Sequence, residues 1–121
     1  MKATGLTIGK DEGTKQEFPW GEIRWIWNSQ MDKDAEQTLG HVVIHPGVKN
    51  TLHGHPNCEE LLYVLTGECD HWIGDENHRL KPGMTVVIPR GSEHYAEVTS
   101  TEPLRALIFY SSPDRETDVK E

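Results

Sequence analysis

The sequence has no long apolar run. Stretches such as residues 61–65 are far shorter than the roughly 20 residues that a membrane-spanning helix needs. The sequence also lacks the kind of basic amphipathic stretch that binds a membrane surface. Residues 1–10 lack the apolar core of a secretory signal peptide. We therefore expect a cytoplasmic protein with no membrane partner.

Positive charge is also scarce in this chain. It has 12 basic and 20 acidic residues, and its net charge is −8. An acidic surface repels the phosphate backbone of DNA and RNA. The charge balance therefore excludes nucleic acid from the expected partners.

Cysteine is nearly absent, since only Cys58 and Cys69 occur. Without a secretory signal we expect both to be reduced thiols. If residues 66–68 form a hairpin turn, Cys69 lies opposite Val64 rather than opposite Cys58. The expected geometry therefore argues against a disulfide.

Internal repeats, low-complexity blocks and linkers are missing too. A length of 121 residues is close to the commonest size of one domain. We predict a single domain over residues 1–121, with a core of residues 20–111. Residues 112–121 are polar and charged, so we expect them to form a frayed tail.

What remains is a series of short segments with strand character, separated by glycine and proline. No segment has a convincing helical period. The expected strands cover residues 22–27, 41–44, 61–65, 69–73, 85–88 and 104–110, and a further strand follows residue 93. This pattern is typical of an all-β antiparallel sandwich or barrel.

Three polar residues near the middle of the chain are expected to share a face. His53 and His55 are two apart, so in an extended segment both imidazoles point the same way. After the next turn, Glu60 has the same parity as the apolar Leu62, which places its carboxylate inside. A carboxylate in an apolar interior is costly unless a positive charge pairs with it.

A divalent metal ion bound by the two histidines would supply that charge, with His94 as a third imidazole. An isolated His-X-His pair is weak support for a metal site, because most histidines bind no metal. Rival chemistries have less support, since the sequence has no Ser–His–Asp arrangement, phosphate-binding loop or Cys-X-X-Cys pair.

Two spaced motifs resemble those of the cupin family. The first family motif runs glycine, five residues, His-X-His, three or four residues, glutamate, six residues and glycine. Its positions here are Gly47, His53, His55, Glu60 and Gly67. The second runs glycine, five residues, proline, one residue, glycine, two residues, histidine, three residues and asparagine. Its positions here are Gly83, Pro89, Gly91 and His94, with Val98 in place of the asparagine.

The resemblance implies an all-β, jelly-roll-like antiparallel barrel and a metal site held by His53, His55, Glu60 and His94. It also implies one divalent first-row transition metal ion per chain. Three imidazoles and a carboxylate suit Fe, Mn, Ni, Zn or Cu and do not separate them. Small cupins are commonly dimers, so the resemblance further implies a homodimer.

The chemistry stays open at this point. Four protein ligands on a six-coordinate ion leave two positions for a small molecule, as in a catalytic site. We expect a metal-dependent enzyme acting on a small oxygenated metabolite, by dioxygenase-type chemistry or by metal-assisted isomerase or lyase chemistry. The alternative is a non-catalytic cupin module that binds or senses a small molecule.

Other side chains are candidates for roles around the site. Parity over Cys69–Ile73 turns His71 inward, either as a proton shuttle or as a group that supports the metal ligands. Arg24 is a candidate to meet a substrate carboxylate or to form a surface salt bridge. We expect the pocket to be lined partly by His71 and by residues 22–27. Tyr63 and Trp72 fall on outward faces, which favours a second layer or a partner subunit.

Overall fold

Antiparallel strands make up nearly all the regular structure in the computed structural model, which describes residues 7–120. The strands are β1 (Thr14–Phe18), β2 (Gly21–Trp27), β3 (Thr38–Ile44), β4 (His53–Gly54), β5 (Glu60–Thr66), β6 (Cys69–Ile73), β7 (Glu76–Leu80), β8 (Thr85–Ile88), β9 (His94–Val98), β10 (Leu104–Tyr110) and β11 (Asp118–Val119). A short 3₁₀ turn, η1 (Lys10–Glu12), precedes them. No helix within residues 7–120 is long and apolar enough to cross a membrane. Residues 1–6 of the segment tested for a signal peptide, and Glu121, lie outside the described residues.

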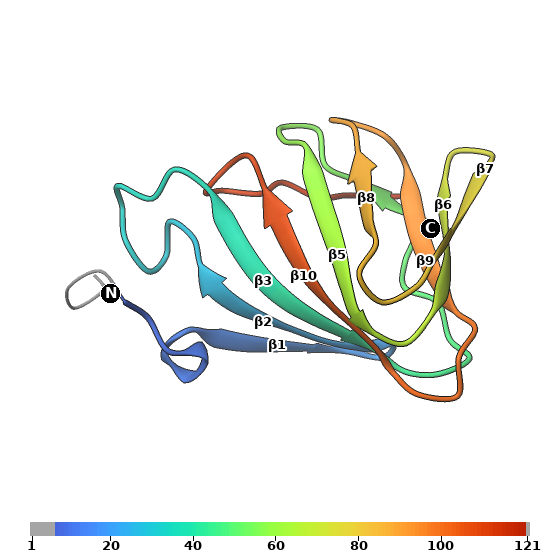
Figure 1. Cartoon of the computed structure of the whole chain (residues 1–121). Helices are drawn as coiled ribbons and strands as arrows, with labels where there is room; N and C mark the ends of the chain where they lie inside the picture. The colour runs from blue at the N-terminus through green and yellow to red at the C-terminus, as the bar shows by residue number, and fades with distance from the viewer. Residues whose placement is uncertain (1–6, 121) are drawn as a thin grey trace.

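The strands form two antiparallel sheets, and Figure 1 labels most of their strands. One sheet has six strands in the order β1-β2-β3-β10-β5-β8, and the other has five in the order β11-β4-β9-β6-β7. Within residues 7–120 no strand pairing joins the two sheets into a closed barrel. The predicted all-β, jelly-roll-like fold is therefore confirmed, although its barrel is not closed. Strand β1 lies before residue 20, outside the core range expected from the sequence.

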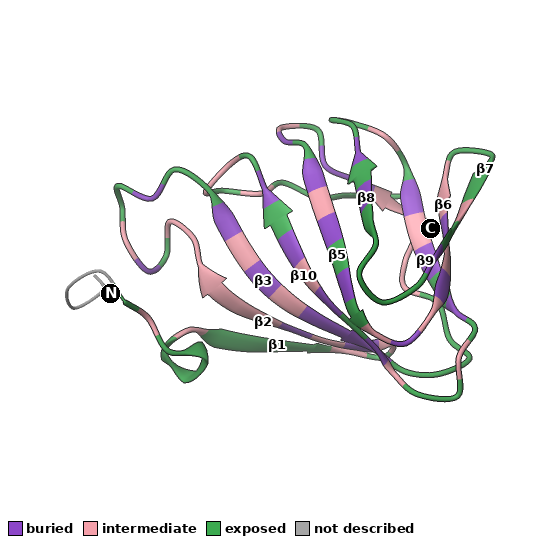
Figure 2. Ribbon diagram, viewed as in Figure 1, coloured by how far each residue is buried: buried purple, intermediate pink, exposed green. Residues whose placement is uncertain are grey.

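Burial alternates along the strands, because successive side chains point to opposite sides of a sheet (Figure 2). Along β5, Glu60, Leu62 and Val64 are buried, whereas Tyr63 is exposed. The inward side chains of both sheets form one hydrophobic core, which includes Ile23, Val42, Ile44, Leu62, Val64, Leu80, Ile88, Val98 and Ile108. The inward parity expected for this strand is confirmed.

The connection between β5 and β6 differs from the prediction. β5 pairs with β10 and β8, whereas β6 pairs with β7 and β9, so residues 66–68 cross between sheets and form no hairpin. Gly67 makes the sharp change of direction with a φ of +80°, a conformation open mainly to glycine. The crossing lets each strand bury its apolar face in the core from its own sheet. Cys58 and Cys69 are buried and free, as predicted.

Residues 112–120, called here the C-terminal strap, contradict the prediction of a frayed tail. β11 pairs with β4, and the Lys120 N–H donates to the Leu52 carbonyl at 3.0 Å. Earlier in the strap, the side-chain amide of Asn57 donates to the Asp114 carbonyl at 2.7 Å. Polar composition alone predicts a loose tail, but here backbone groups of the strap are satisfied by tertiary partners that composition does not reveal.

We predict that Gly67→Ala destabilises the fold at the crossing between sheets. An alanine Cβ would lie 2.6 Å from the Pro103 carbonyl oxygen and 2.8 Å from the Cα of Leu104. Strain and steric overlap together should lower the free energy of unfolding by more than about 2 kcal/mol. Urea unfolding of the metal-free protein measures this loss.

Gly74→Ala is the matched control for this variant. Gly74 also has a positive φ, of +56°, but its added Cβ would meet nothing within 4 Å. We expect a loss of only about 1 kcal/mol, from the backbone conformation. Equal losses in the two variants would contradict the close approach at Gly67.

Candidate metal centre

The four predicted ligands come together from both sheets. His53 lies on β4 and His94 on β9, and these two residues are direct partners in the strand pairing. His55 follows β4, and Glu60 begins β5 in the other sheet. One ligand atom from each residue lies within 4.8 Å of those of the other three. The four residues span 41 positions in the sequence, from His53 to His94. They meet at one point because the two sheets face each other.

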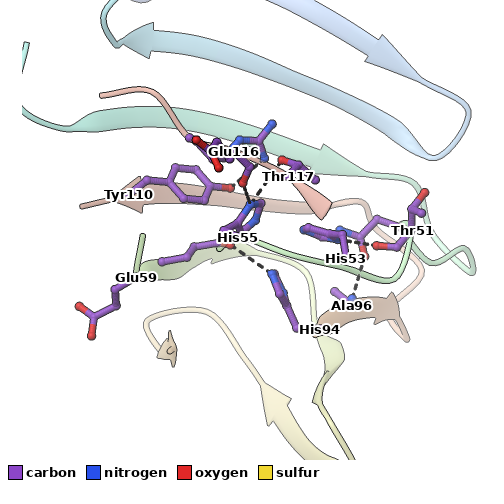
Figure 3. A network of polar contacts seen from close by, with 12 residues as sticks. Thr51, His53, His55, Glu59, His94, Ala96, Tyr110, Glu116 and Thr117 are labelled. Atoms are coloured by element: carbon purple, nitrogen blue, oxygen red, sulfur yellow. Dashed lines mark hydrogen bonds and ion pairs between the residues drawn. The ribbon is translucent and has the colours of Figure 1, made fainter. Parts of the chain in front are cut away.

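The side chains converge on one another, as Figure 3 shows for the histidines. Glu60 Oε1 lies 3.3 Å from His55 Nε2 and 3.4 Å from His94 Nε2. The imidazole of His53 packs beside that of His94, with ring centroids 4.3 Å apart. Glu59, by contrast, points its carboxylate away from the histidines. The convergence therefore selects Glu60 and not its neighbour.

Hydrogen bonds on the far side of each ring fix how the imidazoles are protonated. His53 Nδ1 donates to the Thr51 carbonyl at 2.5 Å, and His55 Nδ1 donates to the Glu116 carbonyl at 2.9 Å. A carbonyl can only accept, so each Nδ1 carries the proton in the neutral ring and each Nε2 keeps a lone pair. Such outer partners are what orient metal-binding histidines in proteins.

Three of the converging atoms are buried and have no hydrogen-bond partner among residues 7–120. They are His55 Nε2, His94 Nε2 and Glu60 Oε1. Buried polar atoms are costly when unsatisfied, and a divalent cation would satisfy all three at once. Donors about 2.1 Å from a shared ion lie at most about 4.2 Å apart, so small shifts bring the four residues into range. The residues present therefore fit a divalent metal ion.

The charge state of the group also suits a cation. Burial lowers the pKa of His94 to about 3 and lowers that of His53 as well, so both rings are neutral near pH 7. Burial alone would raise the pKa of Glu60, but the surrounding imidazoles, His55 foremost, hold it below its usual value. The site thus offers neutral nitrogen ligands and one ionised carboxylate.

His71 is buried on β6 and also lies beside the centre. Its Nε2 is 3.0 Å from His94 Nδ1. If His94 offers Nε2 to a metal ion, its Nδ1 carries the proton. The Nδ1–H group then donates a hydrogen bond to the lone pair of His71 Nε2. Burial lowers the pKa of His71 to about 4, so the ring is neutral and able to accept. The geometry favours the second of the two predicted roles, support of a ligand.

An inner cavity of about 140 Å³ adjoins these residues. Its wall is largely apolar and includes Ile23, Val42, Ile44 and Ile108, and His71 is part of its polar side. Within residues 22–27 the residue that lines the cavity is Ile23. Arg24 does not line it and instead lies 3.8 Å from Asp11 in a surface salt bridge.

The C-terminal strap contributes wall residues that the sequence reading missed. Arg115, Thr117 and Val119 line the inner cavity, and the Glu116 carbonyl between them holds His55. Arg115, Thr117 and Val119 occupy alternate positions, as the residues on one face of a strand do. This alternation is the signal by which the sequence could have predicted them. Because the segment is short and polar, its composition predicted a frayed tail in spite of this signal.

Neither cysteine takes part in this chemistry. Burial raises the pKa of the Cys69 thiol to about 12 and raises that of Cys58 as well. Both therefore stay protonated near neutral pH. Since a thiolate is the nucleophilic and metal-binding form, the two cysteines are structural.

Comparison with known proteins agrees with this architecture. Residues 40–110 match the family model of the cupin domain. The uncharacterized protein MJ1618 of Methanocaldococcus jannaschii is 29% identical over 98 residues, which cover 81% of this chain and 78% of that protein.

Solved oxalate decarboxylases share the fold. That of Lactobacillus farciminis, in a formate complex, has a TM-score of 0.82 and 26% identity over 90% of this chain and 34% of its own. That of Bacillus subtilis, described with Mn(II) centres, has a TM-score of 0.80 and 21% identity over 91% of this chain and 30% of its own. This chain spans about a third of those proteins. The family match over residues 40–110, together with the arrangement of the two sheets, shows that the chain belongs to the cupin family.

Proposed function

We propose that this chain is a metal-dependent enzyme acting on a small oxygenated metabolite. It would bind one divalent first-row transition ion through His53, His55, Glu60 and His94. The observation that carries this proposal is the convergence of the four side chains, three of whose buried donor atoms have no hydrogen-bond partner among residues 7–120. The three imidazole nitrogens and one carboxylate oxygen of the four residues suit Fe, Mn, Ni, Zn or Cu.

The four side chains leave room on one side for a substrate. Four ligands on an ion that prefers six leave two positions, and the inner cavity lies beside His53 and His94. A bound ion would supply Lewis acidity or electron transfer, which serves dioxygenase-type, isomerase or lyase chemistry. The chain itself would exclude water with its apolar walls and orient a ligand that approaches through two oxygens.

We predict that the purified protein holds about one first-row divalent ion per chain. His55→Ala or His94→Ala should lower metal content sharply, because each removes a nitrogen donor. Glu59→Ala is the matched control and should leave it unchanged, since this neighbouring carboxylate is exposed and points away. Elemental analysis measures all three variants. Full metal retention by a His53→Ala, His94→Ala double variant would contradict the assignment.

Catalytic turnover is measured separately from metal content. Metal-loaded protein should turn over a member of a panel of α-hydroxy acids, α-oxo acids, diketones, diols and sugars, tested with and without oxygen. A requirement for oxygen would favour the dioxygenase type over isomerase or lyase chemistry. Tight binding of a panel member without any turnover would instead favour the non-catalytic binding module.

We also predict that His71 acts as a positioning residue for His94. His71→Leu removes the acceptor for His94 Nδ1, and loss of such an outer partner should weaken metal affinity by about 10- to 100-fold. His71→Asn keeps a side-chain acceptor and should restore part of the affinity. Competition with a metal chelator measures the affinities. If His71→Leu keeps full affinity but loses turnover, His71 is a proton shuttle instead.

A homodimer is the assembly that we propose. Apolar side chains are exposed on or beside the outer face of β10, β5 and β8, and they are Tyr63, Leu65, Met84, Val87 and Phe109. A patch of this kind is unusual on a monomer. Trp72 does not belong to it, because it is half-buried on β6 in the other sheet. The interface would therefore use one of the two aromatic residues expected from the sequence.

Light scattering at micromolar concentration should give twice the chain mass for the wild-type protein. Val87→Lys places two like charges near each other across a two-fold interface, so this variant should be monomeric. Val48→Lys, which changes an exposed valine away from this face, should remain dimeric. A monomeric wild-type protein would refute the homodimer.

A further inference from the structure

One arginine of the C-terminal strap reaches the cavity beside the metal centre. Arg115 lines the inner cavity and also borders an outer, more polar hollow of about 520 Å³. Among the described residues around the inner cavity, Glu60 is the sole acidic side chain and Arg115 the sole lysine or arginine. Glu60 is turned toward the imidazoles. Arg115 therefore supplies a positive charge in the wall of a largely apolar space.

The contacts of Arg115 leave its hydrogen-bonding edge available. Its Cζ lies 4.7 Å from the ring centroid of Trp25 and 5.2 Å from that of Tyr110. A guanidinium held beside aromatic rings in this way still carries five N–H donors along its edge. One of them donates to the Tyr110 hydroxyl at 3.4 Å. Within residues 7–120 Arg115 forms no ion pair.

The aromatic contacts also hold the guanidinium close to the ligand histidines. The ring of Tyr110 packs edge-on against that of His55, with centroids 5.1 Å apart. Arg115 contacts the same Tyr110 ring, and Thr117 two residues later lies 3.4 Å from His55 Nδ1. The neighbouring carboxylate of Asp114 is engaged by the Ser29 hydroxyl. The ring of Tyr110 therefore lies in contact with both the guanidinium of Arg115 and the imidazole of the ligand His55.

The charge balance of this space favours an anion. With a divalent ion bound, Glu60 offsets one of its two charges and Arg115 adds another. The cavity would then hold about two net positive charges between largely apolar walls, which is costly without a counter-charge. A ligand that brings a carboxylate offsets this cost, whereas a neutral sugar or diol does not.

We infer that Arg115 binds the carboxylate of a small α-oxo or α-hydroxy acid whose oxygens also face the metal centre. This inference rests on the proposed function and names the ligand class of the same site. The planar edge of arginine matches a carboxylate in geometry. The inner cavity, at about 140 Å³, is close in size to a cavity of roughly 150 Å³ that holds benzene, so it suits a short alkyl group.

Calorimetric titration of the Co²⁺-loaded protein with a matched pair of probes tests this inference. The probes are 2-oxopentanoate and 2,3-hexanedione, in which a methyl group replaces the charged oxygen of the acid. Arg115→Gln should weaken binding of 2-oxopentanoate by about 10- to 100-fold and leave that of the diketone nearly unchanged. Arg115→Lys keeps the charge, so its affinity for 2-oxopentanoate should lie between those of the wild type and Arg115→Gln. Arg105→Gln, which changes an exposed arginine on β10, should match the wild type.

Elemental analysis of each sample separates failure of this inference from failure of the proposed function. If metal is bound but Arg115→Gln binds 2-oxopentanoate as tightly as the wild type, Arg115 does not bind the carboxylate. Equal losses for both probes would also overturn the inference, because they indicate a general disturbance of the cavity. Absence of metal from the wild-type protein would overturn the proposed function itself.

Discussion

The carboxylate of Glu60 is buried among imidazoles in the interior of the sheets, and much of the structure is arranged around it. A charge in such a place needs a partner of opposite sign, and the protein brings nitrogen donors to it rather than a lysine or arginine. The pairing of β4 with β9 sets His53 beside His94, and the start of β5 sets Glu60 opposite them. The same apolar walls that make the carboxylate costly also exclude water from whatever binds next to it.

The outer partners of the imidazoles tie this centre to distant parts of the chain. His53 is held by the backbone near it, His94 by a histidine of the neighbouring strand, and His55 by the carbonyl of Glu116 near the C-terminus. Each partner meets Nδ1, so Nε2 is the nitrogen left for a metal ion. The orientation of three rings therefore depends on three separate elements, and one of them is a segment of polar composition that packs little apolar surface.

That segment, the C-terminal strap, has a structural role, and the recognition role that we infer for Arg115 would come from the same segment. Its backbone completes the smaller sheet through β11 and fixes His55, while its alternate side chains Arg115, Thr117 and Val119 face the inner cavity. Polar composition is compatible with this position because strand pairing and Asn57 satisfy its backbone. A strap of this kind places a charged side chain near the centre without putting that charge in the core.

The sequence by itself determined the features that depend on local parity and spacing. Alternation with a period of two turned Glu60 inward and Glu59 outward, the His-X-His spacing aligned two rings, and the motifs over residues 47–98 indicated the cupin fold. Tertiary structure alone decided which strands share a sheet and what the polar C-terminus does. β5 and β6 carry the signals of a hairpin yet lie in different sheets, and each buries its apolar face in the shared core from its own sheet. Likewise, the place of Arg115 depends on hydrogen bonds from residues some sixty positions away, such as the one from Asn57 to Asp114, and no local pattern encodes such contacts.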